Sequence, residues 1–357
     1  MNFTSGESII TVASFGTFNG FTPKMLLDIS ASNTLLWEQS TTATNVGPKN
    51  YTPSYLGWPT GKKQAQPYTF VNGISINPSM EQWADQTCIA KLCMPQYPFW
   101  INSAPAATQT IADGVIGLAN ANTTFPQQMD YPLSKFRNKI FTLSYDSNLT
   151  RADHIFTLGG IDKRYVPDGA ETKWAKSVGA PKWALSVASA TFGQESFDFG
   201  IPSLNATLSN TIDEYFFPLA FFDRVTNYFI YLYPEFDRGH DFTIFWNKTL
   251  GCPADAPDLL FNVLAADNST STIPITIKAS SYLSYDNKAQ VCNVLFKPAT
   301  SDTLLLGDKF FHNYVVSFDP VGAITCEPPK VCHRIGFTDR LQTPIPKSVE
   351  ELLMEQI

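Results

Sequence analysis

The chain has 357 residues, a length that exceeds one ordinary domain and favours two. Charged residues make up only 16% and the net charge is -7, which argues against a nucleic-acid-binding surface because such a surface needs dense basic residues. With 27 Phe and 25 Pro, the composition predicts a large apolar core made of many short elements separated by turns.

Cysteines and glycosylation sequons indicate an oxidising compartment. The six cysteines are an even number, which is compatible with three disulfides. Chance alone gives about three or four Asn-x-Ser/Thr sequons, whereas this chain has seven, at Asn2, Asn50, Asn122, Asn148, Asn205, Asn247 and Asn268. Neither a signal peptide nor an apolar run long enough to span a membrane is visible. We therefore expect a secreted or lysosomal/vacuolar glycoprotein whose leader is not present in this sequence.

The first elements lead to a buried acid. Residues 8–14 alternate loosely between polar and apolar, as in a half-buried strand, and residues 16–23 predict a turn. Residues 24–37 then read Lys-Met-Leu-Leu-Asp-Ile-Ser-Ala-Ser-Asn-Thr-Leu-Leu-Trp, which predicts a buried strand that carries Asp28 into a tight turn. An unpaired buried charge is costly, so Asp28 either caps its own turn or has a chemical role.

This stretch resembles the first catalytic loop of the pepsin-like aspartic peptidases, apolar-apolar-Asp-Thr-Gly-Ser-Ser-Asn-apolar-Trp. The positions that match are Asp28, Ser32, Asn33 and Trp37. The positions that differ are Ile29, Ser30 and Ala31, where the family has Thr, Gly and Ser. The resemblance therefore implies that the acid is retained while its turn is altered.

Several later segments resemble family strands in the expected order. They are residues 112–119, 140–145, 156–162, 182–187, 304–319 and 334–337. In the family, a glycine in the first of these threads through the loop of the catalytic strand, and Gly307 supplies a second such glycine. The resemblance implies an all-β, bilobal pepsin-like fold, with two mostly antiparallel β lobes around a central cleft and few short helices. The expected lobes are residues 1–166 and 167–345, followed by a tail at 346–357 whose end predicts a short amphipathic helix.

The second catalytic turn is expected within residues 200–207. In this register Ser203 replaces the second aspartate, and Asn205 stands where the family has Gly. A rival register uses Asp198 and Gly200, which restores an acid and a glycine but shortens the preceding hairpin. A nucleophilic role for Ser203 is disfavoured because no histidine is placed by motif to activate it.

The flap over the cleft is expected at residues 67–73, with a turn at Asn72-Gly73 between apolar arms. Tyr68 and Phe70 are the candidates for the flap aromatic residue, and Phe70 falls nearer the family position. Cys88 and Cys93 form either a local disulfide or half of a metal site, and the histidine spacing favours the disulfide. The resemblance implies two further bridges, Cys252–Cys292 and Cys326–Cys332.

Family members hydrolyse peptides with two aspartates that share one proton, so that one acts as base toward a water and the other as acid. Losing either acid removes half of that proton transfer. We therefore expect a catalytically inactive homologue that keeps the cleft for a peptide or protein, needs no metal or cofactor, and is a monomer without a membrane span. The alternatives are a divergent endopeptidase that uses Asp28 and Asp198, and an inhibitor or decoy that binds another enzyme.

Overall fold

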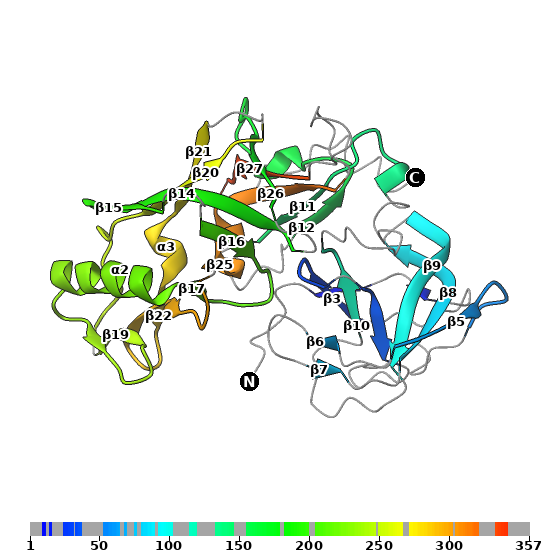
Figure 1. The fold of residues 1–357 in the computed structure, drawn as a ribbon, viewed down its shortest axis with the longest axis horizontal. Coiled ribbons are helices and arrows are strands. Elements are labelled where there is room, and N and C mark those ends of the chain that lie inside the picture. The colour runs from blue at the N-terminus through cyan, green and yellow to red at the C-terminus, as the bar shows by residue number, and fades with distance from the viewer. Residues whose placement is uncertain are drawn as a thin grey trace. The chain divides into compact units, whose positions relative to one another are not determined.

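The structure is a computed structural model that describes residues 9–11, 14–15, 24–31, 33–37, 53–64, 68–69, 75–76, 80–89, 92–102, 114–119, 133–145, 155–178, 182–199, 204–247, 249–266, 271–302, 304–320 and 333–341. These residues form mostly β-strands in several sheets, so the prediction of a mostly β protein is confirmed (Figure 1). The expected tail helix at residues 349–357 lies outside the described residues.

The chain forms two compact units, and neither is continuous in sequence. Unit 1 comprises residues 1–137, 179–183 and 208–212, and unit 2 comprises residues 138–178, 184–207 and 213–357. The sequence indicated a boundary between residues 166 and 167, whereas this division begins unit 2 at Asn138. The extent of each expected lobe therefore stays a prediction.

Unit 1 contains one 8-stranded sheet, ordered β1-β3-β10-β4-β9-β8-β2 with β5 paired to β8. Its strands are β1 (Ile9–Thr11), β2 (Ser14–Phe15), β3 (Lys24–Asp28), β4 (Leu35–Trp37), β5 (Trp58–Gln64), β8 (Met80–Ile89), β9 (Leu92–Asn102) and β10 (Gly114–Gly117). A separate hairpin joins β6 (Tyr68–Thr69) to β7 (Ser75–Ile76). Around the turn after β3, an apolar cluster packs Ala31, Leu35, Met80, Trp100 and Val115 together.

Unit 2 contains three sheets. The 8-stranded sheet follows the order β21-β20-β14-β16-β25-β17-β24, with β15 on β14. Its strands are β14 (Ala184–Phe192), β15 (Glu195–Asp198), β16 (Leu204–Leu208, whose last residue belongs to unit 1), β17 (Tyr215–Phe217), β20 (Leu259–Leu264), β21 (Thr272–Ile277), β24 (Phe296–Pro298) and β25 (Leu304–Leu306). The 5-stranded sheet contains β12 (Ile155–Leu158), β11 (Phe141–Ser144), β26 (Tyr314–Asp319), β27 (Arg334–Asp339) and β13 (Lys173–Lys176). The 4-stranded sheet contains β18 (Asp237–Arg238), β19 (Ile244–Asn247), β23 (Val291–Val294) and β22 (Leu283–Asp286).

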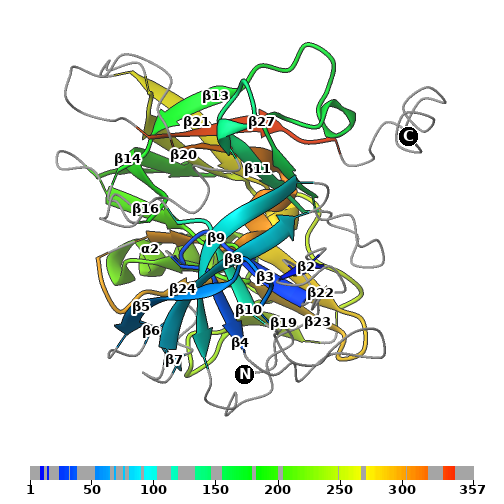
Figure 2. The same ribbon diagram turned by 90° about the vertical axis from the view of Figure 1, so that its right-hand side faces the viewer.

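The same strand path occurs once in each unit. In unit 1, β3 and β4 are consecutive in the chain, but the later strand β10 lies between them in the sheet. In unit 2, β16 and β17 are consecutive, and β25 lies between them in the same way. Figure 2 shows β3, β10 and β4 as neighbours in unit 1. Each unit thus inserts a distant strand beside a strand-turn-strand segment.

Helix α2 (Leu219–Leu232) was not expected from the sequence. Its buried side chains are Phe221, Phe222, Val225, Thr226 and Phe229, which recur at the spacing of one helix face. Pro218 lies between the apolar strand β17 and this helix. It occupies the N-cap, directly before the helix, where the missing N–H of proline costs no intrahelical bond. The described residues also contain helix α3 (Ala279–Tyr282) and two 3-10 turns, η1 (Lys163–Tyr165) and η2 (Asp308–His312), and Leu133 and Ser134 are helical as well.

The tight turn between β22 and β23 offers a simple stability prediction. Gln290 is exposed and has φ 54, a left-handed conformation that a side chain disfavours and glycine adopts freely. Gln290→Gly is therefore expected to raise the free energy of unfolding by about 0.5–1 kcal/mol in urea titrations. Lys288→Gly, at an exposed position of the same turn without positive φ, is the matched control and is expected to lower it. Equal effects of both changes would contradict the interpretation.

Candidate functional site: the turn after β3

Strand β3 delivers Asp28 into the core of unit 1, as its apolar sequence predicts. Met25 and Leu27 are buried, and the Asp28 side chain is 0% exposed. The strand pairs antiparallel with β1 and parallel with β10, so that Gly117 lies beside Asp28. A carboxyl group is thus held between two strands in an apolar layer.

The turn itself satisfies one oxygen of this carboxyl. The Ser30 backbone N–H donates to Asp28 Oδ1 at 2.7 Å, and the Ser30 hydroxyl donates to the same atom. The Ala31 N–H donates to the Asp28 carbonyl oxygen at 3.3 Å, which closes the turn. Ile29 and Ala31, the other altered positions, are buried and apolar. The arrangement matches the structural alternative, in which the acid caps its own turn.

The second oxygen of Asp28 is in a different situation. Oδ2 is fully buried and has no hydrogen-bond partner among the described residues. Burial raises the pKa of the Asp28 carboxyl, and this effect outweighs the lowering by the bonds from Ser30 and Ala31. The protonated, neutral form is therefore favoured more strongly than for an exposed aspartate.

Gly117 passes through the loop that follows Asp28. A Cβ added at this position would lie 2.5 Å from the carbonyl oxygens of Ala31 and Asn33 and 2.7 Å from the Asn33 nitrogen. These are backbone atoms, so no side-chain movement could make room. The Leu118 N–H then donates to the Asp28 carbonyl oxygen at 2.9 Å. The expectation that glycine is needed here for close backbone approach is confirmed, whereas the same role for Gly307 stays a prediction.

Asn210 clamps the two residues that flank Asp28. Its side-chain Oδ1 accepts from the Ile29 N–H at 3.0 Å, and its Nδ2 donates to the Leu27 carbonyl oxygen at 2.7 Å. Asn210 is buried, and it lies in the 208–212 segment that belongs to unit 1. Sequence reasoning missed this residue.

The segments 208–212 and 179–183 are tied to this site by further bonds. The Trp183 indole Nε1 donates to the Leu118 carbonyl oxygen at 2.7 Å, and the Leu208 N–H donates to the Trp183 carbonyl oxygen at 2.9 Å. Ser209, which precedes Asn210, is fully buried, and its Oγ lies 3.3 Å from Thr211 Oγ1. The turn that meets the Asp28 loop is therefore 209–211, and it contains no acid.

The expected register of the second turn is described only in part. Leu204 and Asn205, which that register placed in the turn, lie in strand β16, where Asn205 pairs with Ser186 and its side chain is exposed. Strand β16 pairs with β14 up to Thr207, and the turn that follows it begins at Ser209. Ser203 lies outside the described residues.

The rival acid also lies in a strand. Asp198 is the last residue of β15, where it pairs with Ser189, and its side chain is exposed in unit 2. Asp28, in contrast, is buried in unit 1. The two environments therefore differ in solvent access.

The expected flap residues lie beyond the end of a longer hairpin. Strands β5 and β8 pair antiparallel up to Gln64 and Met80, and β6–β7 is inserted between them in sequence. Tyr68 belongs to β6 and pairs with Ile76, whereas Phe70 and the Asn72-Gly73 turn lie outside the described residues.

Two of the expected disulfides are confirmed. Cys88–Cys93 closes the end of the β8–β9 hairpin, and Cys252–Cys292 closes a loop of 40 residues in unit 2. Closing a loop of that length is expected to stabilise the fold by about 4 kcal/mol through the unfolded chain. Cys326 and Cys332 lie outside the described residues.

A pH-dependence test follows from the raised pKa of Asp28. An aspartate with a raised folded-state pKa stabilises the fold fully below its unfolded value, and this contribution is lost as pH rises through the folded value. Asp28→Asn, which is always neutral, should therefore remove this fall in stability as pH is raised from about 4, the ordinary value for an aspartate, into the alkaline range. Urea midpoints of both proteins across this range measure the difference. A wild type that gains stability relative to the variant as pH rises would contradict the prediction.

Chemically, this turn offers one buried carboxyl with a raised pKa, and the 209–211 segment, whose Asn210 bonds to Leu27 and Ile29, contains no acid. A pair of carboxyls that exchange a proton is not assembled by the residues of the two turns. No group of three or more potential metal ligands is found in the described part of the chain, and no helix there is long and apolar enough to cross a bilayer. No protein-family model matches the chain, and no curated protein matches it.

Proposed function

We propose that this chain is a pepsin-like aspartic peptidase homologue that has lost peptide hydrolysis and serves as a peptide- or protein-binding protein. The kinship is supported first by the repeated strand path. The segments 24–37 and 204–217 each consist of a strand of five residues, six connecting residues and a strand of three, and each accepts a later strand between its two strands; the second segment belongs to unit 2 except for residues 208–212.

The kinship is supported second by the contacts beneath Asp28. In the pepsin-like family, threonines that follow the two catalytic acids cross-link the two loops. Here the Asn210 amide joins Leu27 and Ile29 from the second turn. If Asn210 takes the place of the family threonine, Ser209 takes the place of the second acid. In the register proposed from these contacts, Ser209 rather than Ser203 stands at the position of the second catalytic acid.

The loss of hydrolysis rests on one observation: the residue that precedes the bridging Asn210 is a serine. A serine hydroxyl cannot share a proton with Asp28 as a second carboxyl would, and a missing acid or base costs typically 10²–10⁴-fold in rate. The buried Oδ2 of Asp28 supports the same conclusion, because a catalytic carboxyl must reach the reacting water. We place the protein in a secreted or lysosomal/vacuolar compartment, which the two disulfides favour.

The direct test is a cleavage assay. At acid pH the purified protein should leave a mixed peptide library uncleaved, as measured by mass spectrometry. When the protein is immobilised on a column, it should retain some of the peptides in that library. Cleavage that a statine-type analogue inhibits and that Asp28→Ala abolishes would overturn the proposal. That outcome would favour the divergent endopeptidase, and Asp198→Ala would then test the rival acid.

A restored variant tests the kinship separately from the inactivity. Ile29→Thr, Ser30→Gly, Ser209→Asp, Asn210→Thr and Thr211→Gly together recreate the Asp-Thr-Gly triplet of both family turns in the register of the Asn210 contacts. This variant should gain cleavage at acid pH over the wild type. Its matched control places the acid at Ser203 instead of Ser209, and that control should gain nothing. Equal activity of the two variants would contradict the assignment of Ser209.

A further inference from the structure

The 4-stranded sheet of unit 2 has two unlike faces. Residues along a strand alternate between faces, so Ile244 and Trp246 share one face of β19, and Phe245 and Asn247 share the other. On the first face, Ile244, Cys292 and Val294 are buried. On the second face, which we call the outer face, no residue of the four strands is buried; its members are Asp237, Phe245, Asn247, Ser284, Asp286, Val291 and Asn293. The outer face therefore faces solvent.

Asn247 begins a sequon, Asn247-Lys-Thr249, and it is the last residue of β19 on this outer face. Its side chain is exposed, as an attached sugar requires. Phe245 lies two residues before Asn247 on the same face and is half-buried. On the neighbouring strand β23, Val291 is the direct partner of Asn247. Side chains directly opposite each other in an antiparallel pair lie about 4.5–5.5 Å apart at Cβ. Asn247 is thus flanked by two apolar side chains that point the same way.

We propose that Asn247 carries an N-linked glycan whose first sugar packs against Phe245. The amide Nδ2 would attack C1 of an oligosaccharide carried on a polyisoprenyl pyrophosphate. The C1–O bond to the pyrophosphate breaks, the pyrophosphate leaves with its electron pair, and Nδ2 loses one proton. The proposal rests on the secretory location included in the proposed function.

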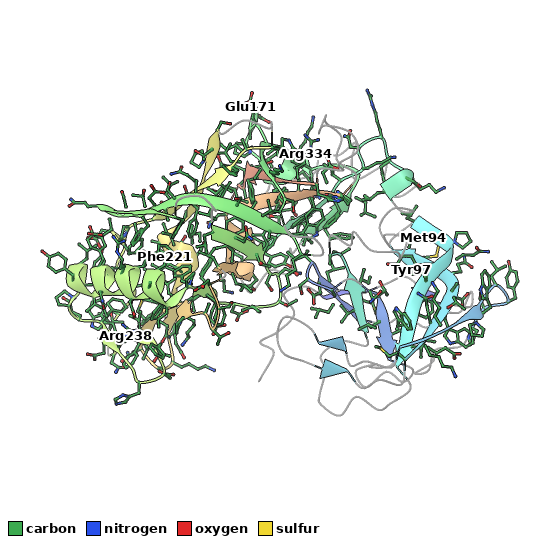
Figure 3. All side chains as sticks on the ribbon, viewed as in Figure 1. Met94, Tyr97, Glu171, Phe221, Arg238 and Arg334 are labelled. Carbon is green, nitrogen blue, oxygen red and sulfur yellow. A yellow bond between two sulfur atoms is a disulfide. The ribbon has the colours of Figure 1, made fainter. Side chains whose placement is uncertain are left out.

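An apolar shelf beside Asn247 gives the glycan a structural role. Sugar rings present C–H groups on one face, and an aromatic ring with a negative π-face attracts such weakly positive hydrogens. Leu250, a large apolar residue just after the sequon, is 93% exposed, and a glycan at Asn247 would shield it from water. In Figure 3, Arg238 marks the adjacent strand β18 of the same sheet.

The third sequon residue indicates when the modification occurs. Thr249 is buried, and its Oγ1 donates to the Gly251 carbonyl oxygen at 2.7 Å, while its N–H donates to the Gln290 carbonyl oxygen at 3.2 Å. An enzyme that reads the Thr249 hydroxyl needs this turn open. The sugar is therefore attached before unit 2 completes its fold.

Asn205 is the internal comparison, because its sequon is the other one in the described part of the chain. Its side chain is also exposed, but its strand β16 is central in the sheet, between β14 and β25. Its direct partner on β14 is Ser186, a small polar residue without an apolar surface for a sugar. We expect Asn247 to be occupied in more molecules than Asn205.

The test uses the full chain secreted from a eukaryotic host behind a signal peptide. Enzymatic removal of N-glycans in heavy-oxygen water converts each occupied asparagine to labelled aspartate, which peptide mass spectrometry locates. Asn247 should be labelled in most molecules, and both Asn247→Gln and Thr249→Ala should remove this label. Thr249→Ser keeps the hydroxyl and should keep the label. An unlabelled Asn247, with or without label at other sequons, would overturn the proposal.

The contact with Phe245 needs a readout of its own. Removing the glycan from the folded wild type should lower its Tm, and in Phe245→Ala this shift should be lost. Val291→Ala, on the other flank, serves as a second variant if Phe245→Ala is not secreted. An identical shift in wild type and variants would refute the packing. None of these measurements depends on peptide cleavage. If Asn247 is labelled and the protein also cleaves peptides, the proposed function is refuted and the proposed glycan is supported.

Discussion

Gly117→Ala is expected to prevent unit 1 from reaching its native fold. The added methyl group would approach three backbone atoms of Ala31 and Asn33 to within 2.7 Å or less, and the loop that carries these atoms is held by Asp28. A change of this kind belongs to the exceptional class that costs more than about 4 kcal/mol. The expected result is loss of cooperative unfolding, or no recoverable folded protein, in circular dichroism and urea titration.

Gly160→Ala is the matched control for this change. A Cβ at Gly160 would meet nothing within 4 Å, and the residue does not have positive φ. Its free energy of unfolding should stay within about 0.5 kcal/mol of the wild type. If Gly117→Ala behaved like this control, the passage of β10 through the Asp28 loop would be refuted.

Asn210→Leu is expected to lower the free energy of unfolding by about 2–6 kcal/mol, because it leaves two buried backbone groups without partners. These groups are the Ile29 N–H and the Leu27 carbonyl oxygen. The local signature is loss of hydrogen-exchange protection at the Ile29 amide, which should exceed the loss elsewhere in unit 1.

The control for Asn210→Leu is Asn227→Leu on the exposed face of helix α2. It makes the same chemical change without exposing a buried bond and should alter stability by less than about 0.5 kcal/mol. An unchanged exchange rate of the Ile29 amide in Asn210→Leu would show that the hydrogen bonds of the Asn210 side chain do not stabilise this turn.

Much of the β framework could be predicted because its signals are local. The run of apolar residues before Asp28 and the glycine at 117 each leave a pattern in a few consecutive residues. The Cys88–Cys93 bridge could be favoured from spacing alone. Helix α2 was missed because Pro218 can either break an apolar strand or precede a helix, and the choice depends on the phenylalanine cluster packed beneath the helix.

The 209–211 turn, which contacts the Asp28 loop, could not be located from the sequence because it contains neither an acid nor a glycine. The two expected registers were centred on Ser203 and Asp198, whereas strand β16 pairs with β14 and continues to Leu208. Asn210 gives no motif of its own, since its role depends on two backbone groups 181 and 183 residues away. Only the tertiary structure brings them together.

That separation has a consequence for synthesis on the ribosome. The segment 208–212 belongs to unit 1, although the 65 residues 138–178 and 184–207 of unit 2 precede it in the chain. A nascent chain that has emerged only to residue 200 lacks the amide that ties Leu27 to Ile29. Its N-terminal part therefore lacks these bonds until the chain has emerged as far as Ile212, and unpaired strand edges are exposed to aggregation during that interval.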